Sequence, residues 1–443
     1  MSDQPTELSI EDALQNAIQL HRAGKLDVAD TWYRRILSVA PDYPDAIHFR
    51  GLLLHQRDRS DEGLALIERS IALDPTAGRH NNLAIALLDR QRFEEAVAAF
   101  ERSVQLDPRD ADVLNNLGSI RNALGRTDEA EQSLLAALEA NPGHFAALTN
   151  LGNLRAMNGR TAEAIDLYWK VLSVHPGQEH TRRMLGFAYY QIGDYESAAN
   201  VFRKWLESEP DNPTAKHMVA ACSGVDVPAR ASDEYVEKTF DAFAQSFDSK
   251  LAVLQYRAPQ LVCDALGKVA GAPARDLAIL DAGCGTGLCG PLLAPYASRL
   301  VGVDLSARML DAARARGGYH ELVKGELTEH ISALAPGGWD VIVSADTLCY
   351  FGELDAVFAA TARALRDGGV LIFTVEAAEP DGAPQGFRIN PHGRYSHTRA
   401  YLERSLGDAG LAVETCEPHV LRTENTKPVD GFLVTSTKLP RRP

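Results

Sequence analysis

The stretch LAILDAGCGTG, residues 277–287, decides the fold of the C-terminal half of the chain. An apolar run that passes directly into a glycine-rich turn is typical of a buried strand ending at a ligand site. Glycines at 283, 285 and 287 permit a tight turn and let a ligand approach the backbone closely. The sequence therefore predicts a binding site at the carboxyl end of this strand.

Further apolar strands follow this turn, and helical segments separate them. We expect strands at 299–304 (RLVGVD), 339–346 (WDVIVSAD) and 370–376 (VLIFTVE), and two closing strands near the C-terminus. Short apolar strands alternating with helices indicate an α/β domain with a mostly parallel sheet. Before the first strand, Ala258-Pro259 is expected to divide the segment 235–266 into two helices.

Acidic residues at the strand ends distinguish between possible ligands. The run from Gly285 to Gly290 satisfies the literal dinucleotide motif, but Asp281 precedes the first glycine and would repel a pyrophosphate. A carboxylate there suits a ligand with an ammonium group. Asp304 ends the second strand, where it can accept both ribose hydroxyls, and Glu326 can accept from an adenine amino group. The pattern favours S-adenosylmethionine (SAM) over NAD.

Five motifs in residues 235–443 resemble those of the class I SAM-dependent methyltransferases. They are LDAGCGTG, VGVDLSARML, GEL, WDVIVSADTL and LRDGGVLIF. The segments TFDAFAQSFD, LQYRAP and GRYSHTRAYLERSLGDAGL further resemble a bacterial subgroup of methyltransferases fused to tetratricopeptide repeats. The resemblance implies a Rossmann-like domain with a seven-stranded, mostly parallel sheet. It also implies SAM as cofactor and S-adenosylhomocysteine as product.

The same resemblance implies a set of cofactor-binding residues. The glycine turn would hold the methionine part near Asp281, and Leu305 and Met309 would cover the adenine. Ser344 and Asp346 would border the sulfonium. The alternative for Met309 is ordinary helix core, and for Glu326 a solvated loop acid. The full set is Asp281, Gly283, Cys284, Gly285, Gly287, Asp304, Leu305, Met309, Glu326, Leu327 and Ser344.

Methyl transfer requires the enzyme to align the reacting groups and exclude water, and it requires a base only if the acceptor is protonated. The resemblance places Asp346, Tyr350 and His397 on the acceptor side as candidate catalytic residues. His392 is a further candidate, and the alternative for a single loop histidine is an ordinary surface residue. The Tyr256-Arg257 pair could serve the SAM carboxylate or an acidic acceptor. SADTL stands where some families carry an Asn-Pro-Pro-Tyr motif, and the paired-glutamate loop of arginine methyltransferases is missing. Both departures disfavour methylation of adenine N6, glutamine N5 and arginine.

The N-terminal half is an array of repeats. Helical runs end in a proline at intervals of 33 or 34 residues, and small and large residues recur at fixed distances before each proline. A small residue on each helix of a hairpin lets the two axes approach closely, and the large residue fills the neighbouring groove. The prolines are Pro41, Pro75, Pro108, Pro142, Pro176 and Pro210. The small residues are Ala17, Gly51, Ala84, Gly118, Gly152 and Gly186 on the first helices and Ala29, Gly63, Ala96, Ala130, Ala164 and Ala198 on the second helices. The large residues are Tyr33, Ile67, Phe100, Leu134, Tyr168 and Phe202.

This pattern resembles the tetratricopeptide repeat (TPR) family. It implies an all-α TPR superhelix over residues 10–222, with six repeats and a capping helix at 213–222, then a linker at 223–234. Such arrays bind extended peptides or partner helices in a concave groove. Asn82, Asn116 and Asn150 occupy one groove-facing position, where a ladder of amides can grip a peptide backbone. Phe49 and Met184 stand there in repeats two and six, and solvated asparagines are the alternative reading.

Charge and composition restrict the partners. The net charge is −15, and both halves are acidic, which disfavours nucleic acid. The polar N-terminus and the absence of a long apolar run predict a cytoplasmic protein with no membrane span. Six cysteines without a C-x-x-C pair predict no metal site.

Two functions remain open at this stage. One is a SAM-dependent methyltransferase of a protein or small-molecule acceptor, with the array recruiting a partner or substrate. The other is a TPR scaffold whose second domain senses SAM without catalysis. The sequence leaves the acceptor and the oligomeric state open.

Overall fold

The computed structural model describes residues 8–424 and 427–440. The chain forms two compact units that divide between Ala188 and Tyr189. The division lies inside helix α11 (Glu179–Gln191), which is the first helix of the sixth predicted repeat. Each unit is described separately below.

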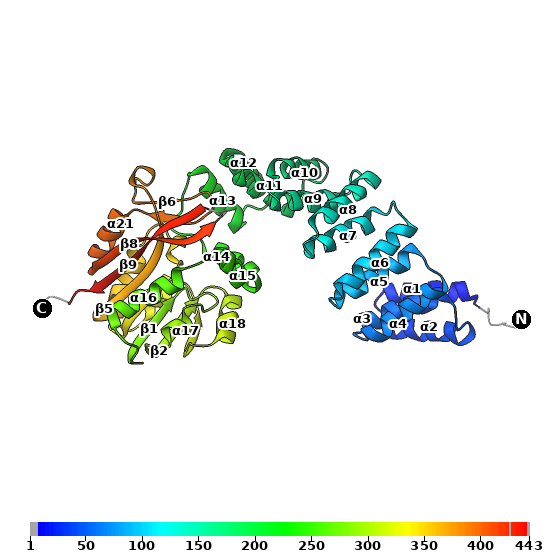
Figure 1. The fold of residues 1–443 in the computed structure, drawn as a ribbon, viewed down its shortest axis with the longest axis horizontal. Coiled ribbons are helices and arrows are strands. Elements are labelled where there is room, and N and C mark those ends of the chain that lie inside the picture. The colour runs from blue at the N-terminus through cyan, green and yellow to red at the C-terminus, as the bar shows by residue number, and fades with distance from the viewer. Residues whose placement is uncertain (1–7, 425–426, 441–443) are drawn as a thin grey trace, which may run out of the picture. The chain divides into compact units, whose positions relative to one another are not determined.

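The first unit consists of helix hairpins (Figure 1). Every second helix ends two residues before one of the predicted prolines, since proline cannot continue the helical hydrogen bonding. The helices before α11 are α1 (Ile10–Arg22), α2 (Leu26–Val39), α3 (Pro44–Gln56), α4 (Ser60–Leu73), α5 (Ala77–Asp89), α6 (Phe93–Leu106), α7 (Ala111–Ala123), α8 (Thr127–Ala140), α9 (Phe145–Met157) and α10 (Thr161–Val174).

Packing inside the hairpins follows the predicted pattern of small and large residues. Tyr33, Phe100 and their equivalents are at most 1% exposed. A Cβ atom added to Gly51 would lie 2.8 Å from the carbonyl oxygen of Gly63, so the two helix backbones touch where both residues are glycine. The turn residues have positive φ, including the non-glycine Asp58 at 59°. The repeat geometry is therefore confirmed at residue level.

Six helical segments open the second unit before its sheet begins. Helix α13 ends at Ser223 and α14 begins at Asp233, with no helix between them. Ala258 and Pro259 begin α16, so the predicted break falls just before them, after the end of α15. The segments are α12 (Tyr195–Ser208), α13 (Pro213–Ser223), α14 (Asp233–Phe243), the 3-10 turn η1 (Ala244–Ser246), α15 (Phe247–Val253) and α16 (Ala258–Ala270).

The sheet of the second unit has five parallel strands in the order β3-β2-β1-β4-β5. Antiparallel β9 pairs with β5, and β8 pairs with β9, which completes the predicted seven strands. A short hairpin, β6–β7, was not predicted; β7 pairs with Glu376 and Ala377 beyond the end of β4. The strands are β1 (Leu277–Ala282), β2 (Ala297–Asp304), β3 (Glu321–Lys324), β4 (Trp339–Ser344), β5 (Leu365–Ala377), β6 (Phe387–Ile389), β7 (Tyr395–His397), β8 (Leu411–Glu424) and β9 (Lys427–Lys438).

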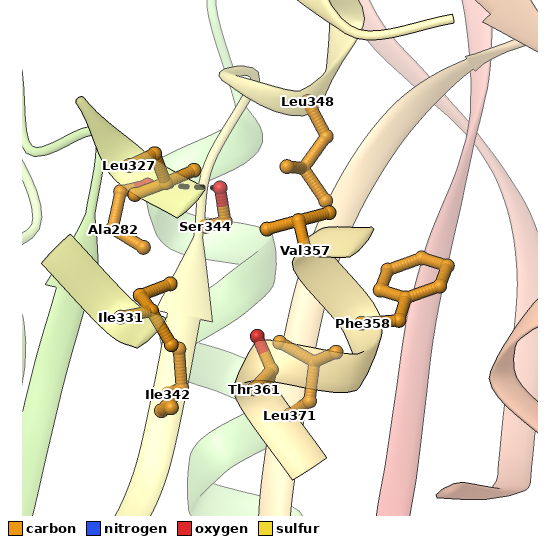
Figure 2. A pocket seen from close by; sticks show the side chains of 10 residues that line it. All are labelled: Ala282, Leu327, Ile331, Ile342, Ser344, Leu348, Val357, Phe358, Thr361 and Leu371. Atoms are coloured by element: carbon orange, nitrogen blue, oxygen red, sulfur yellow. Dashed lines mark hydrogen bonds between the residues drawn. The ribbon is translucent and has the colours of Figure 1, made fainter. Parts of the chain in front are cut away.

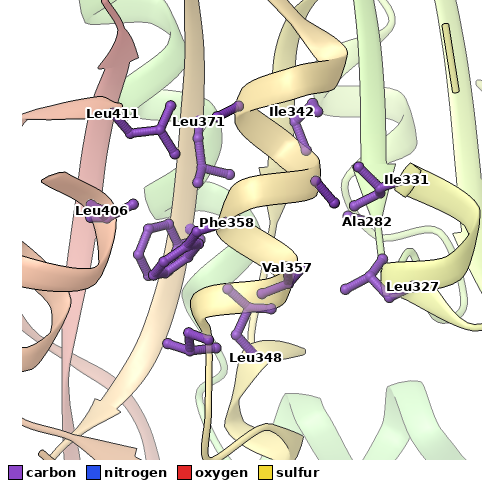
Figure 3. Packing of buried hydrophobic residues seen from close by; sticks show 14 of the residues in the cluster. Ala282, Leu327, Ile331, Ile342, Leu348, Val357, Phe358, Leu371, Leu406 and Leu411 are labelled. Atoms are coloured by element: carbon purple, nitrogen blue, oxygen red, sulfur yellow. The ribbon is translucent and has the colours of Figure 1, made fainter. Parts of the chain in front are cut away.

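Helices cover both faces of this sheet, so the central strands are apolar on both sides. On one face, α16 and α17 (Gly290–Leu293) pack against β1 and β4. On the other face, α19 (Leu327–Ala333), α20 (Asp355–Ala364) and α21 (Arg399–Asp408) pack around Phe358 and Leu371 (Figure 3). Helix α18 (Ala307–Arg316) follows β2. This three-layer arrangement fixes the strand ends where the predicted site residues lie.

Candidate functional site

The predicted site residues gather at the carboxyl edge of the parallel strands. β1 lies between β2 and β4, so the turn after β1 is flanked by Asp304 at the end of β2 and by Ser344 at the end of β4. In open α/β sheets this edge is where ligands bind. The three motifs are separated in sequence and adjacent in the fold.

The glycine turn has the backbone that the sequence predicts. Gly283, Gly285 and Gly287 have φ values of 83°, 53° and 81°. A Cβ atom on Gly283 would lie 2.2 Å from the hydroxyl oxygen of Thr347, so the turn packs directly on the loop after β4. A Cβ atom on Gly285 would meet nothing within 4 Å. The middle of the turn is therefore open on the side from which a ligand can approach it.

Asp304 ties the end of β2 to this turn. One carboxylate oxygen accepts from the Gly285 amide and the other from the Ser306 amide, each at 2.9 Å. Burial raises the pKa of Asp304, and these amides oppose that rise. Ser306 also caps α18, because its hydroxyl oxygen accepts from the Met309 amide. The carboxylate is held in one orientation before any ligand binds.

Asp281 is fully buried beneath the glycine turn. Its Oδ2 accepts a hydrogen bond from the Tyr319 hydroxyl at 2.5 Å, whereas its Oδ1 has no partner. Burial raises the pKa of Asp281 to about 7, the Tyr319 hydrogen bond lowers it, and the nearby Asp304 raises it. Sequence reasoning missed Tyr319, which lies 38 positions from its partner.

Two further buried carboxylates at this edge each keep one oxygen without a partner. Glu326 caps α19, where Oε2 accepts from the Glu329 amide at 2.7 Å and Oε1 is unpaired. Asp346 has a positive φ of 57°, accepts from Arg422 through Oδ2 at 2.6 Å, and leaves Oδ1 unpaired. An unsatisfied buried acceptor costs about 1–3 kcal/mol, so groups of this kind usually mark a ligand site or a bound water.

The remaining predicted cofactor residues differ in exposure. Leu305 is half-buried, whereas Met309 is 1% exposed and lies on the buried face of α18. Ser344 donates its hydroxyl to the Ala282 carbonyl at 2.8 Å, so that hydroxyl is already engaged (Figure 2). Leu327 and Ser344 line a small, mainly apolar cavity between the sheet and α20. Ala282, the residue before the glycine turn, also lines this cavity.

On the acceptor side, Asp346 belongs to a buried ionic network. Arg422, 3% exposed, contacts Asp346, Glu376 and Glu424. Arg394 contacts Glu376 at 2.6 Å and Glu424 at 2.7 Å. Both guanidinium groups are thus occupied by carboxylates, and three acids face two arginines. The only unpaired oxygen of these carboxylates within the described chain is Oδ1 of Asp346.

The other candidate catalytic residues are placed differently. His397 is fully buried, its Nε2 contacts the Gly352 carbonyl at 3.0 Å, and burial lowers its pKa to about 4. Burial raises the pKa of Tyr350 well above its ordinary value, and its ring packs edge-on against Phe240 of α14. His392 lies 3.4 Å from Glu376, and burial lowers its pKa to about 4.

The Tyr256-Arg257 pair lies just before α16. The Tyr256 hydroxyl lies 3.5 Å from the Ala345 carbonyl, and Arg257 is exposed. Tyr256 therefore borders the loop after β4 that carries Asp346.

The segment 233–253 is fastened to the cofactor motifs by acidic residues. Asp248 of α15 accepts from the Thr286 hydroxyl in the glycine turn at 2.6 Å and pairs with Arg316. Asp241 of α14 accepts from the Ser306 hydroxyl at 2.5 Å. These contacts were not predicted, because acids on an amphipathic helix ordinarily face solvent.

In the first unit, the predicted asparagine ladder has contacts within the array. The side-chain nitrogen of Asn82 lies 2.9 Å from His48, and that of Asn150 donates to Asn115 at 2.9 Å and to Ser119 at 3.0 Å. Asn116 is half-buried. These bonds use the side-chain nitrogens of Asn82 and Asn150 and do not engage their amide oxygens.

Residues 8–424 and 427–440 contain no candidate metal cluster and no helix of membrane-spanning character. No cluster of three or more His, Cys, Asp or Glu side chains suited to a metal ion is present in that part of the chain. Within the same residues, no helix is long and apolar enough to cross a membrane.

Comparison with known families identifies both parts of the chain. Residues 280–373 match the methyltransferase domain family. Residues 81–144 and 123–179 match one tetratricopeptide repeat family, and residues 155–222 match another. The chain is therefore a fusion of TPR repeats with a methyltransferase domain, as the motifs predicted.

Individual relatives are similar over a smaller part of the chain. Methyltransferase-like protein 27 of Homo sapiens is 37% identical over 105 residues, which are 24% of this chain and 43% of that protein. The malonyl-[acyl-carrier protein] O-methyltransferase of Serratia marcescens is 31% identical over 143 residues, 32% of this chain and 53% of that protein. The ubiquinone biosynthesis O-methyltransferase of Thiobacillus denitrificans is 28% identical over 160 residues, 32% and 68% respectively. The chain thus spans about half the length of the first two relatives.

Proposed function

We propose that this protein is a SAM-dependent methyltransferase that acts on a protein or small-molecule acceptor. The observation that carries the proposal is the set of unpaired buried carboxylate oxygens around the glycine turn, on Asp281, Glu326 and Asp346. SAM fits these residues, since it has an ammonium group for Asp281, an adenine amino group for Glu326 and no phosphate. When bound, SAM supplies a methyl group on a positively charged sulfur.

The residues of this chain hold that cofactor by different means. Asp304, fixed by two amides, accepts the ribose hydroxyls. The open Gly285 lets the amino-acid end approach the backbone. Leu305 is the apolar contact of the adenine, and Met309, which is 1% exposed, supports this side of the site from the core. S-adenosylhomocysteine, the product, offers the same contacts except the methyl group.

Where the acceptor carries a proton, we infer that Asp346 is the base. Its Oδ1 is unpaired, and burial raises its pKa, which strengthens it as a base. Tyr350 keeps its proton, because burial raises its pKa, and His397 is a weak base in the interior. Oxygen acceptors are consistent with the names of the O-methyltransferase relatives.

The TPR array is proposed to recruit a partner or the acceptor. TPR domains present peptide-binding grooves, and Asn82, Asn116 and Asn150 lie one repeat apart on the first helices of their hairpins. Their amide oxygens can accept from a peptide backbone. Changing all three to alanine should abolish methylation of a macromolecular acceptor and leave SAM affinity unchanged. Full activity in the triple variant would reassign the array to another role.

A methyl-transfer assay tests the enzymatic proposal directly. The full chain is incubated with methyl-labelled SAM and a lysate from cells that lack the protein, and the labelled species identifies the acceptor. Asp346→Asn serves as a matched variant, since it keeps the side-chain shape and removes the charge. Binding of SAM without any labelled product, in lysates of several growth states, would favour the sensor function instead.

A further inference from the structure

Tyr319 is a residue of the site to which the cofactor motifs give no role. It follows Gly317 and Gly318, directly after the end of α18. Its hydroxyl donates to Asp281 Oδ2 at 2.5 Å, and the other oxygen of that carboxylate has no partner. The short distance between a hydroxyl and a carboxylate indicates a charge-assisted bond. The bond leaves Oδ1 as the free oxygen of Asp281.

The position of the Tyr319 ring depends on glycines from three segments of the chain. A Cβ atom would lie 3.1 Å from the ring on Gly287, 2.5 Å on Gly290 and 2.9 Å on Gly302. Gly287 closes the glycine turn, Gly290 begins α17 and Gly302 lies in β2. These close approaches hold the ring under the turn, so they explain two glycines, Gly290 and Gly302, that the cofactor motif alone does not require.

Among the described side chains, Tyr319 is the one hydrogen-bond donor to Asp281. The other charged or titratable groups around Asp281 are an acid and two thiols. Asp304 on β2 carries the same charge and raises the pKa of Asp281. Cys284 and Cys289 are neutral thiols, because burial raises their pKa values. Burial also raises the pKa of Tyr319, which keeps the hydroxyl proton for donation.

We propose that Tyr319 is a positioning residue that favours the ionised form of Asp281 and turns its free Oδ1 toward the ammonium group of SAM. The proposal rests on the proposed function, since it assumes that the ligand carries an ammonium group at that point. Without the Tyr319 hydroxyl, the buried carboxylate would bind its proton at higher pH and lose its attraction for a cation. Tyr319 thereby sets the pH above which the cofactor binds.

Two ligands separate this electrostatic role from simple packing. S-adenosylhomocysteine carries the amino-acid end, whereas 5′-methylthioadenosine has the adenosine and thioether but no ammonium group. Their dissociation constants are measured by isothermal titration between pH 6 and 8 for the wild type and Tyr319→Phe, which keeps the ring among its glycines. Tyr296→Phe is the matched control, since the Tyr296 hydroxyl lies beside Gly267 of α16, whereas the donor to Asp281 is Tyr319.

The expected result is that Tyr319→Phe binds S-adenosylhomocysteine roughly tenfold more weakly at pH 7, as loss of one hydrogen bond to a charged group predicts. The rise of affinity with pH should also move to higher pH. Binding of 5′-methylthioadenosine and all properties of Tyr296→Phe should stay unchanged. In an Asp281→Asn background, Tyr319→Phe should have no further effect on S-adenosylhomocysteine.

Equal weakening of both ligands with no change in pH dependence would overturn the proposal and make Tyr319 a packing residue. The double-variant comparison decides the matter if Tyr319→Phe alone proves unstable, since additive losses would also overturn it. A wild type that binds neither SAM nor S-adenosylhomocysteine refutes the proposed function itself, which is a separate and recognisable outcome.

Discussion

Replacement of Asp304 by alanine tests whether the end of β2 is the ribose site. The carboxylate accepts from the Gly285 and Ser306 amides, each at 2.9 Å, and both lose their acceptor in Asp304→Ala. In the bound state the same carboxylate is expected to accept two ribose hydroxyls. Each hydrogen bond to a charged group contributes about 1.5–3 kcal/mol, so the loss is at most about 3–6 kcal/mol.

That range corresponds to a weakening of roughly 150-fold to 20,000-fold, and water entering the half-buried site will recover part of it. We therefore expect at least a tenfold increase in the dissociation constant of SAM, measured by isothermal titration. Circular dichroism of the free variant should report a folded protein. Asp311→Ala is the control, since Asp311 is an exposed acid on α18 whose only described partner is Arg314.

A folded Asp304→Ala variant with unchanged SAM affinity would refute the reasoning. It would mean that Asp304 serves only to brace the glycine turn and that the ribose lies elsewhere. A loss of affinity in Asp311→Ala as large as in Asp304→Ala would also contradict the reasoning, because the effect would then follow net charge and not the two directed hydrogen bonds.

Three further predictions concern stability. Gly152→Ala places a Cβ atom 2.6 Å from the Tyr168 ring and should cost about 1–3 kcal/mol of unfolding free energy in the first unit, with SAM affinity unchanged in titration. Arg422→Met should cost about 3–5 kcal/mol in urea unfolding, because buried carboxylates lose their cation; a neutral result would show that the network is solvated. His397 has a folded-state pKa of about 4, so its contribution is full above pH 6.5 and is lost as pH falls toward 4. His397→Gln should therefore remove up to roughly 3 kcal/mol of the difference in stability between pH 7 and pH 4, and equal slopes in both proteins would contradict this.

The fold was predictable where the signal is local in sequence. In the array, each hairpin is defined by residues within one repeat, so small residues such as Ala29 and large ones such as Tyr33 are both fully buried as expected. In the sheet, the apolar runs that lead into Gly283 and Asp304 correctly predicted β1 and β2. The hairpin β6–β7 was missed, because three-residue strands are too short to show alternation.

The site was predictable only in its motif residues. Asp281 and Asp346 were identified from their places after strands, but their partners Tyr319 and Arg422 lie 38 and 76 positions away. Tyr319 precedes β3, which is two strands away from β1, and Arg422 lies in β8, which joins the sheet only through β9. A tyrosine after two glycines and an arginine in a closing strand have no local pattern that marks them. The tertiary fold alone brings them to the carboxylates.

The end of the repeat array has a physical connection to the acceptor side of the methyltransferase domain. His217 of α13 is buried, contacts the Gly393 carbonyl at 2.7 Å and stacks on Tyr235 with ring centroids 4.0 Å apart. The next residue after Gly393 is Arg394, which contacts Glu376 in the ionic network.

A fragment that begins after α13 would therefore lose the packing that holds this loop. Lost activity in such a fragment could reflect a displaced Arg394 as readily as a missing peptide groove. A fragment that begins at Tyr189 keeps α12 and α13 and removes the preceding repeats. Comparing the two fragments separates the structural task of the last helices from the recruiting task proposed for the array. If both fragments methylate the acceptor equally, the contact between His217 and Gly393 has no part in the activity.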